Sequence, residues 1–436
     1  MQWIYLDNNA TTRPAPEVTA TVTEAMQQYW ANPSSAHRLG QQVRQRVELA
    51  RQSVARLLGV EPRELIFTSG GTESNNLALR GLLEGTLSRE NPGVLVTTPV
   101  EHSAVREPAE AWAQLGGMVE ELPIDADGLV RIEGLSDLLV RHLREPRTVV
   151  LSVQWANNET GVIQPVEAIA QAVHDARVAV KQAESGADTG GVSASVSASA
   201  GRSGSRSAAA KLYLHTDATQ AVGKLAVDAK RSGVDLLTLA GHKFHGPKGV
   251  GALYVRSGVR LRAIQRGGAQ EREKRGGTEN TFGIIGLGVA ADLARQFVMD
   301  EARIAELRTL RDRFESLVCE RVGNVRINGT GGPEAGSDVP KRLWNTSNLA
   351  FPGLEAEAIL LGLSERGVCA SAGAACSSGS LEPSPVLLAM GLDDPTAHGS
   401  VRFSLSRHTT ADEIERAAEV VAEVVAKLGR TLPLGV

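Results

Sequence analysis

The segment Gly241-His242-Lys243 places a lysine among small and polar residues, directly after the apolar run Leu236–Ala240. Burial of an amine in such a setting disfavours its charged form, so Lys243 can become a free amine that attacks a carbonyl carbon. A second apolar run, Leu212–Leu214, leads into Asp217. A carboxylate at that point either caps the following helix or pairs with a buried cation, and the residues around it leave both interpretations open.

Polar residues also follow three further apolar runs. After Leu65–Thr68, the segment Ser69–Glu73 contains two adjacent glycines, a turn that offers backbone N–H groups and a hydroxyl to an anion, although many such loops are only turns. Glu101-His102 follows the second run, and Asn157-Asn158 follows the third. A single histidine is more often structural than catalytic, and asparagine pairs are often turn formers, so neither segment alone identifies a reaction.

Together these groups supply the parts that pyridoxal phosphate requires from a protein. Lys243 would bind the cofactor as a Schiff base, and Asp217 would keep the ring nitrogen protonated so that the ring withdraws electrons. Gly71, Thr72 and His242 would hold the phosphate group. The combination predicts a pyridoxal-phosphate enzyme, which none of the segments predicts by itself.

A cysteine and an arginine complete the candidate reactive residues. Cys376 lies in a run of small residues, 370–380, whose backbone freedom would let its thiol travel to a substrate sulfur held over the ring. The alternative is an inert cysteine at a junction between helices. Arg402 has a planar guanidinium that would match a substrate carboxylate, or would form an ordinary ion pair. Cys319 and Cys369 are interpreted as packing or incidental residues.

The elements that must position these residues are short β-branched runs alternating with stretches of helical period. This pattern predicts an α/β fold with a large, seven-stranded, mainly parallel sheet that helices cover on both faces. In such sheets ligands bind beyond the carboxyl ends of the strands, so the residues after the strands are expected to meet there. The predicted strands are Leu65–Thr68, Val94–Thr98, Met118–Pro123, Thr148–Trp155, Leu212–Asp217, Leu236–Ala240 and Gly251–Val255.

The rest of the chain predicts a smaller α+β domain. We expect residues 13–298 to form the large pyridoxal-phosphate-binding domain, and residues 1–12 with 299–436 to form the small domain that carries the cysteine loop. Residues 184–210, almost wholly Ser, Ala and Gly, predict a flexible surface insertion, with a partner-docking arm as the alternative. The small domain's predicted elements are a helical pattern from about Ile284 to Val322, strands at Val325–Asn328, Thr346–Phe351 and Val401–Ser406, a helix at Glu355–Arg366, and a last helix with Thr410 and Glu413 at capping-box spacing.

Composition sets outer limits on the function. The 436 residues carry a formal net charge of −4, which offers no basic surface for nucleic acid. Neither a signal peptide nor an apolar run approaching the roughly 18 to 20 residues that span a bilayer is evident. Three cysteines are too few and too unevenly spaced for a disulfide framework or a zinc cluster, so we expect a cytoplasmic protein without an intrinsic metal.

In their order and in their residues, the motifs resemble those of the cysteine desulfurases of the NifS/IscS type, which are class V, fold-type I pyridoxal-phosphate enzymes. The resemblance spans nearly the whole chain apart from the Ser/Ala/Gly insertion. The motifs that carry it are Tyr5–Thr12, Thr68–Asn75, Glu101-His102, Asn157–Glu159, Asp217–Gln220, Gly241–Lys243, Arg275–Asn280, and Ala375-Cys376 through Leu381–Ser384.

This resemblance implies a role for each candidate residue. His102 would stack on the pyridine ring and move protons, Gln220 would bond the ring hydroxyl, and Asn158 would lie beside that hydroxyl and the substrate carboxylate. Thr278 would reach the phosphate from the other subunit of a homodimer. L-cysteine would yield L-alanine while Cys376 takes the sulfur and passes it to an iron–sulfur scaffold protein or a thiolation enzyme, with at most a transient iron–sulfur contact through its persulfide.

Two alternatives stay open at this stage. A selenocysteine lyase, a cysteine sulfinate desulfinase or another class V aminotransferase would share most of the motifs, although the Cys376 segment argues against it. A non-catalytic interaction protein would keep the same fold. The sequence also departs from the family at Ala240, where many relatives carry a phosphate-binding serine, and this departure predicts weaker retention of the cofactor.

Overall fold

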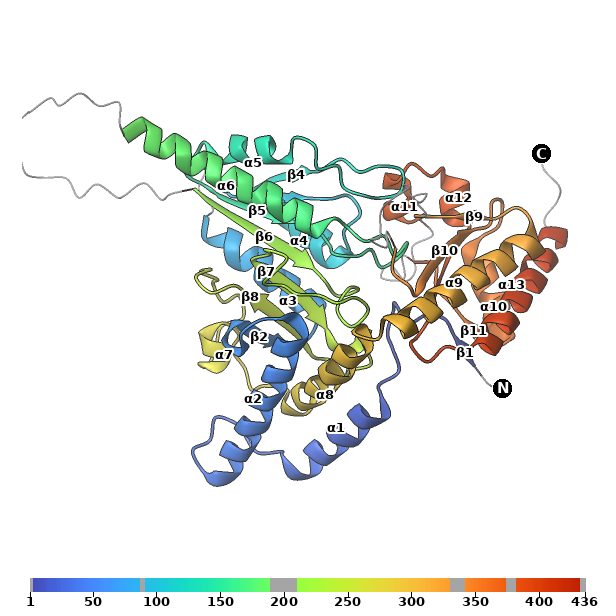
Figure 1. Ribbon diagram of the computed structural model, residues 1–436, viewed down its shortest axis with the longest axis horizontal. Helices are drawn as coiled ribbons and strands as arrows, with labels where there is room; N and C mark the ends of the chain where they lie inside the picture. Colours follow the sequence, from blue (N-terminus) through green and yellow to red (C-terminus); the bar gives the residue numbers. More distant parts are fainter. Residues whose placement is uncertain (1–2, 87–90, 189–209, 330–341, 374–381, 432–436) are drawn as a thin grey trace, which may run out of the picture.

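The computed structural model describes residues 3–86, 91–188, 210–329, 342–373 and 382–431. Its main feature is a sheet with the strand order β2-β8-β7-β6-β5-β3-β4 (Figure 1). β8 pairs antiparallel with β2 and β7, and the other pairings are parallel, which confirms the predicted seven-stranded, mainly parallel sheet. The strands are β2 Leu65–Thr68, β3 Val94–Thr97, β4 Met118–Glu121, β5 Thr148–Ser152, β6 Lys211–Asp217, β7 Leu236–Ala240 and β8 Gly251–Val255.

Helices cover both faces of this sheet, and the strand residues alternate between two cores because successive side chains point to opposite faces. Val149 and Leu151 of β5 belong to one core, and Val150 belongs to the other. Burial on both faces explains why these strands appear in the sequence as continuous apolar runs. The first core is covered by α1 Pro16–Gln28, α2 Arg38–Leu58, α5 Leu135–Leu143, α6 Val166–Asp188 and α8 Thr281–Val298, and the second by α3 Gly71–Leu83 and α4 Ser103–Gln114.

Among the described residues, α8 is the one helix long and apolar enough to cross a membrane by length and composition. Most of it, 61%, is buried inside the protein, where it packs against α2 and α1. Such burial is typical of a core helix. The expectation that no apolar stretch approaches membrane-spanning length was therefore wrong for α8, whose composition follows from its place in the core.

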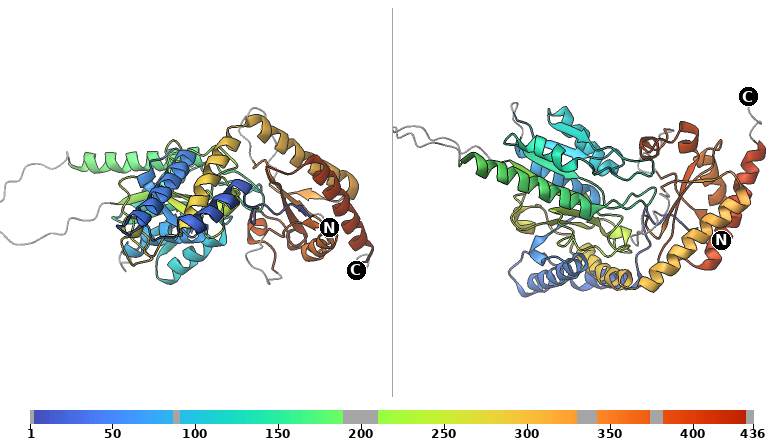
Figure 2. Two further views of the ribbon diagram at one scale, coloured as in Figure 1. Left: turned by 90° about the horizontal axis from the view of Figure 1, so that it is seen from below. Right: turned by 45° about the horizontal axis from the view of Figure 1, so that its top comes forward.

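A separate buried cluster surrounds a three-stranded antiparallel sheet with the order β12-β10-β9. This part lies to one side of the large sheet, and α9 leads into it (Figures 1 and 2). Leu349 of β10 and Phe403 of β12 are fully buried there with residues of α9, α10 and α13. The elements are α9 Glu301–Val322, β9 Arg326–Ile327, β10 Thr346–Ala350, α10 Ala356–Glu365, α11 Pro385–Ala389, α12 Asp394–His398, β12 Ser400–Ser404 and α13 Ala411–Thr431.

Two short strands were not predicted from the sequence. β1 (Ile4–Tyr5) pairs in parallel with β11 (Val368–Cys369), and Asp7 bridges to Ser404 of β12. Leu6, between these contacts, is fully buried in the cluster of the small sheet. Residues 4–7 therefore pack with segments from the other end of the sequence. The division into domains 13–298 and 1–12 with 299–436 stays a prediction.

The predicted helical pattern from Ile284 to Val322 is divided in the structure. α8 ends at Val298, and α9 begins after Asp300, whose side chain accepts a hydrogen bond from the backbone nitrogen of Arg303 (3.0 Å). A polar cap of this kind satisfies an N–H group that has no partner inside the helix, so it starts a new helix rather than continuing the old one. Four short helices complete the described elements: α7 Gln270–Glu273 and the 3-10 turns at Pro62–Glu64, Glu84–Thr86 and Gly241–Lys243.

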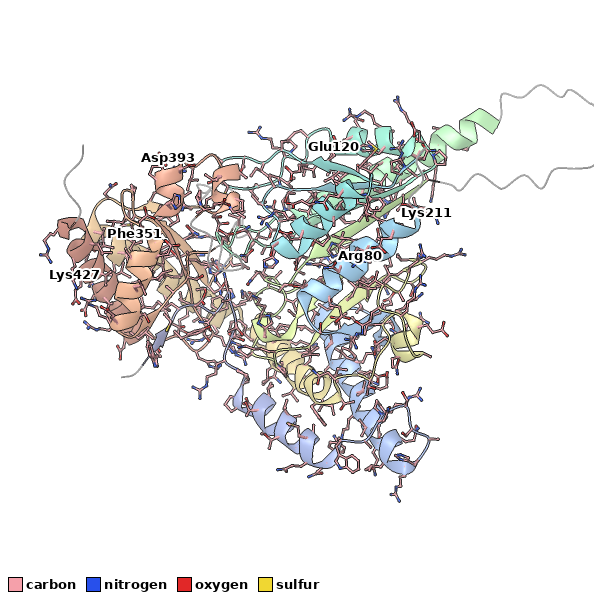
Figure 3. All side chains as sticks on the ribbon, turned by 180° about the vertical axis from the view of Figure 1, so that it is seen from behind. Arg80, Glu120, Lys211, Phe351, Asp393 and Lys427 are labelled. Atoms are coloured by element: carbon pink, nitrogen blue, oxygen red, sulfur yellow. The ribbon has the colours of Figure 1, made fainter. Side chains whose placement is uncertain are left out.

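The Ser/Ala/Gly segment begins later than predicted. α6 continues to Asp188, so the first residues of the expected insertion from Glu184 are helical, and residues 189–209 lie outside the described residues. Lys211, at the start of β6, marks where the chain re-enters the sheet (Figure 3). The predicted capping box is confirmed, because Thr410 N donates to Glu413 Oε2 (2.9 Å) and Glu413 N donates to Thr410 Oγ1 (3.3 Å).

Candidate active site

A cavity of about 270 Å³ lies where the carboxyl ends of β3, β5, β6 and β7 face the first turn of α3. This is the position at which open α/β sheets bind ligands. Ala10, from the segment after β1, and Ala240, at the end of β7, also line it. The predicted site residues that line the cavity are Gly71, Thr72, His102, Asn158, Asp217, Gln220, His242 and Lys243.

Lys243 enters the cavity from the 3-10 turn that follows β7. Its Nζ donates hydrogen bonds to the backbone carbonyls of Asn9 (2.7 Å) and Ala10 (2.9 Å). The same N-terminal segment is fixed to the lysine turn, since Thr12 N donates to the carbonyl of His242 (2.9 Å). The amine is therefore held by carbonyl groups at a defined place in the cavity.

Asp217 ends β6 and is almost fully buried, with 8% of its surface exposed. One carboxylate oxygen accepts from Asn75 Nδ2 (2.6 Å), and the other accepts from the backbone nitrogen of Thr219 (2.9 Å). These two donors fix the direction of the carboxylate. Asn75 was not identified as a site residue from the sequence, although its place one turn into the helix after the glycine pair could have suggested it.

The first turn of α3 is suited to an anion. Its N-cap is Gly70, so no side chain occupies the backbone N–H groups at this end of the helix. A Cβ atom on Gly71 would lie only 3.1 Å from Thr219 Oγ1, so the bare glycine keeps this space open. Thr219 Oγ1 is buried without a hydrogen-bond partner among the described residues, and it lines the same cavity. A phosphate group fits this donor set, because it would accept from both the helix turn and the hydroxyl.

His242 lies beside this anion site in its neutral form. Burial, together with the positive charges of Lys243 and Lys248, lowers the pKa of His242 to about 4. Its Nδ1 lies 3.1 Å from Thr11 Oγ1. At neutral pH the ring therefore offers one N–H donor and one acceptor nitrogen rather than a positive charge.

His102 is the N-cap of α4, and its Nδ1 accepts a hydrogen bond from Ala104 N (3.0 Å). In the neutral ring the proton is therefore on Nε2. The neighbouring Glu101 is fully buried and accepts from Gln154 N (2.7 Å) and Thr98 Oγ1 (3.0 Å). Burial and the charge of Asp217 raise the pKa of Glu101 to about 8, which means that this carboxyl is largely protonated at neutral pH.

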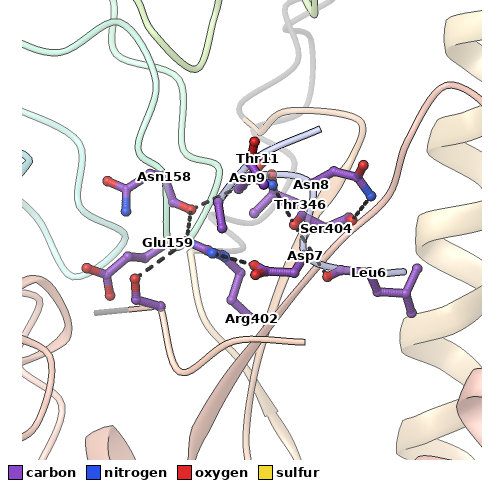
Figure 4. Close-up of polar contacts among 12 residues, drawn as sticks. Leu6, Asp7, Asn8, Asn9, Thr11, Asn158, Glu159, Thr346, Arg402 and Ser404 are labelled. Atoms are coloured by element: carbon purple, nitrogen blue, oxygen red, sulfur yellow. Dashed lines mark hydrogen bonds and ion pairs between the residues drawn. The ribbon is translucent and has the colours of Figure 1, made fainter. Parts of the chain in front are cut away.

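Arg402 of β12 meets the segment after β5 beside the cavity (Figure 4). Its guanidinium forms an ion pair with Asp7 (Nη2 to Oδ1, 2.8 Å), and Nη1 donates to the carbonyl of Asn158 (3.1 Å). The third nitrogen, Nε, is buried without a partner among the residues that the structure describes. The structure thus brings Arg402 and Asn158 together, and it adds Asp7, a partner of Arg402 that the sequence did not indicate.

The remaining candidates lie elsewhere. Thr278 is exposed and does not line the cavity of its own chain. Cys376 falls in residues 374–381, outside the described residues, so its predicted role stays untested. Cys319 and Cys369 are partly buried, and burial raises the pKa of both thiols, which disfavours the reactive thiolate.

Comparison with known proteins agrees with this geometry. A family model described as "Aminotransferase class-V" matches residues 4–184 and 203–417, and the gap between the two matched ranges falls in the Ser/Ala/Gly segment. The cysteine desulfurase of Gluconacetobacter diazotrophicus is 42% identical over 436 residues, which cover 99% of this chain and 96% of that protein.

Two solved structures extend the comparison to the fold. A NifS-like protein has a TM-score of 0.79 at 31% identity, covering 98% of this chain and 100% of its own. SspA in complex with cysteine has a TM-score of 0.70 at 30% identity, covering 93% and 99%. The sheet and the cavity at its strand ends are those of a fold-type I enzyme of the class-V aminotransferase type. The chain belongs to this family, and within it to the cysteine desulfurases of the NifS type.

Proposed function

We propose that this protein is a cysteine desulfurase that binds pyridoxal phosphate through Lys243, converts L-cysteine to L-alanine and leaves the sulfur on Cys376. The observation that carries the proposal is the meeting of Lys243, Asp217 and the open first turn of α3 in one cavity. The family membership supports the choice of L-cysteine as substrate, because the related proteins are named for that reaction.

Pyridoxal phosphate would supply an electron sink for a carbanion at the substrate Cα. Asp217, fixed by Asn75, would keep a proton on the ring nitrogen, and Gln220 would bond the ring hydroxyl. The N–H groups of Gly71 and Thr72 and the ring of His242 would hold the phosphate, with Thr278 of a second subunit in a homodimer. Thr219, whose hydroxyl has no partner among the described residues, joins this set.

The protein's own groups would handle the substrate and its protons. Lys243 Nζ would take the Cα proton and return it, with the carbonyls of Asn9 and Ala10 holding the amine in place between these steps. In its neutral form the His102 ring has its proton on Nε2, and it would serve as a second proton donor. Arg402 and Asn158 would bind the substrate carboxylate. Arg402 Nε has no partner among the described residues, so it could donate to the substrate without breaking the ion pair with Asp7.

The sulfur on Cys376 would pass to a protein acceptor. We propose an iron–sulfur scaffold protein or a thiolation enzyme in the reducing cytoplasm, where a persulfide and its acceptor thiols persist. A net charge of −4 gives no reason to expect nucleic acid as a partner.

Mass spectrometry of Cys376 after addition of L-cysteine tests the proposal. We expect a mass increase of one sulfur atom on Cys376, its loss in Cys376→Ser and its retention in the control Cys369→Ser. The purified protein should also absorb at about 400 nm, and Lys243→Ala should abolish this band. A chain that stays colourless with excess pyridoxal phosphate would overturn the proposal, and faster alanine release from selenocysteine or cysteine sulfinate would reassign the substrate.

A further inference from the structure

Lys224 is a buried lysine behind the cavity wall, with 4% of its surface exposed. Its Nζ donates to Asn9 Oδ1 (2.8 Å) and to Gln220 Oε1. It forms no ion pair with a carboxylate in the described part of the chain, so both of these partners are amide oxygens. Burial lowers the pKa of Lys224 well below its ordinary value, and the nearby charges of Lys243 and Arg402 lower it further. Whether charged or neutral, the amine keeps N–H groups to donate.

We propose that Lys224 is a positioning residue that fixes the amide of Gln220 as a hydrogen-bond donor toward the cavity. This inference rests on the proposed function, because the group that Gln220 would meet is the ring hydroxyl oxygen of the cofactor. Lys224 itself would touch neither the substrate nor the cofactor.

The orientation of the Gln220 amide follows from its contacts. The amide oxygen accepts a hydrogen bond from Lys224, and the amide nitrogen donates one hydrogen to the backbone carbonyl of Asn9 (3.0 Å). Reversing the amide would set its NH₂ group against the N–H groups of Lys224 and its oxygen against a carbonyl oxygen. Since Gln220 lines the cavity, the remaining amide hydrogen is the group that it can offer there.

Asn9 holds Lys224 from the other side. Asn9 Oδ1 accepts from Lys224 and from Asn345 Nδ2 (3.0 Å), so its own amide nitrogen must point away, toward Thr346 Oγ1 (2.9 Å) and the Asn158 carbonyl (3.1 Å). The backbone carbonyl of Asn9 in turn accepts from Gln220 and Lys243. Lys224 thus sets the direction of the Gln220 amide and, together with Asn345, that of the Asn9 amide. The segment of Asn9 also holds Lys243.

The backbone of Lys224 is fixed as firmly as its side chain. Its carbonyl accepts from Trp344 Nε1 (3.0 Å). The preceding Gly223 has φ 78°, and a Cβ atom there would lie 2.4 Å from Phe244 Cβ. The lysine therefore reaches Gln220 from a turn that has little freedom to move.

A fixed donor facing the ring oxygen favours its anionic form over the neutral hydroxyl. Without Lys224 only the Asn9 carbonyl still opposes reversal of the Gln220 amide. We expect the reversed amide, which presents its oxygen and disfavours the anion, to become populated. The consequence is a change in the pH at which the visible absorption band of the cofactor-loaded protein titrates, because that midpoint depends on how strongly the protein stabilises the ring oxygen as an anion.

The test is a spectroscopic pH titration of the loaded Lys224→Met protein. We expect the midpoint of the band to rise by about one pH unit, as the loss of one hydrogen bond to a charged oxygen would produce. Lys230→Met is the matched control, because Lys230 is an exposed lysine in the same stretch of the chain. This substitution should leave the midpoint unchanged. In a Gln220→Met background, Lys224→Met should cause no further shift, because the amide through which it acts is gone.

An unchanged midpoint in Lys224→Met, or a full additional shift in the Gln220→Met background, would overturn the proposal. If Lys224→Met does not fold, Gln220→Glu takes its place, since a carboxylate keeps the contact with Lys224 but presents no N–H. Its midpoint must rise, and a constant midpoint would again overturn the inference. Failure of the parent protein to show any visible band would instead overturn the proposed function, so the two failures are distinguishable.

Discussion

Ala240 provides the most direct quantitative test of the phosphate site. The residue ends β7, is 1% exposed and lines the cavity. Its Cβ would lie 3.7 Å from a Cβ atom placed on Gly71, and Thr219 Oγ1 would lie 3.1 Å from the same point. A serine hydroxyl at position 240 would therefore enter the space next to the first turn of α3, where we propose that the phosphate binds.

The expected gain follows from the value of one hydrogen bond to a charged group, about 1.5 to 3 kcal/mol. Thr219 Oγ1, buried without a partner among the described residues, competes for the new hydroxyl and holds the gain near the lower limit. We therefore expect Ala240→Ser to lower the dissociation constant of pyridoxal phosphate by about tenfold.

Equilibrium dialysis of the cofactor-free protein against pyridoxal phosphate measures this constant. Ala156→Ser is the matched control, because it adds the same hydroxyl to another part of the cavity wall. An unchanged constant in Ala240→Ser, or an equal gain in both variants, would contradict the location that we assign to the phosphate.

Two further predictions concern stability. Glu271→Gln should lower the free energy of unfolding in urea by about 3 kcal/mol. It removes the buried charge partner that contacts the Arg51 guanidinium at 2.6 and 2.9 Å, and leaves this buried group only the half-exposed Glu48, at 3.2 Å, as a charge partner among the described residues. The exposed Glu273→Gln in the same turn is the control, and equal losses in the two would count against the reasoning. The pKa of Glu101 rises from 4.5 to about 8 in the folded state, so between these pH values the folded protein binds a proton that the unfolded chain releases. The contribution of Glu101 to the free energy of unfolding therefore declines as the pH rises from 4.5 to about 8. Glu101→Gln should remove that decline and exceed the parent in unfolding free energy at about pH 9; identical pH profiles would refute this.

The large sheet was predictable because its strands are buried on both faces and their apolar runs are interrupted by polar segments. Each predicted strand has its counterpart, with ends that differ by up to three residues. β1 and β11 were missed because two-residue strands carry no periodic pattern, and their pairing joins segments far apart in the sequence. The break between α8 and α9 was missed because a single N-cap aspartate, Asp300, divides an otherwise continuous helical pattern.

The residues that line the cavity were predictable because they follow the strand ends. Thr219 follows a strand end as well but was not identified, and Asn75 could have been suggested only by its place after the glycine pair. The role of Asp7 was not predictable, because it arises from an ion pair with Arg402 of a distant strand. Lys224 was not identified either, because residues 220–224 form a turn and not a helix, so its spacing from Gln220 indicates no contact. Its burial without an acidic partner among the described residues becomes evident only from the folded structure.

The attachment of residues 4–12 to β12 has a consequence for biosynthesis. Asn8 and Asn9 bond Ser404, which lies 396 and 395 positions later in the chain. A ribosome that adds about 5 to 20 residues per second needs about 20 to 80 s to cover that interval. Segments made early must therefore wait for partners made last, and the wall that holds the reactive lysine stays unfinished throughout. We therefore expect the proposed pyridoxal-phosphate site to become complete only when translation has nearly finished.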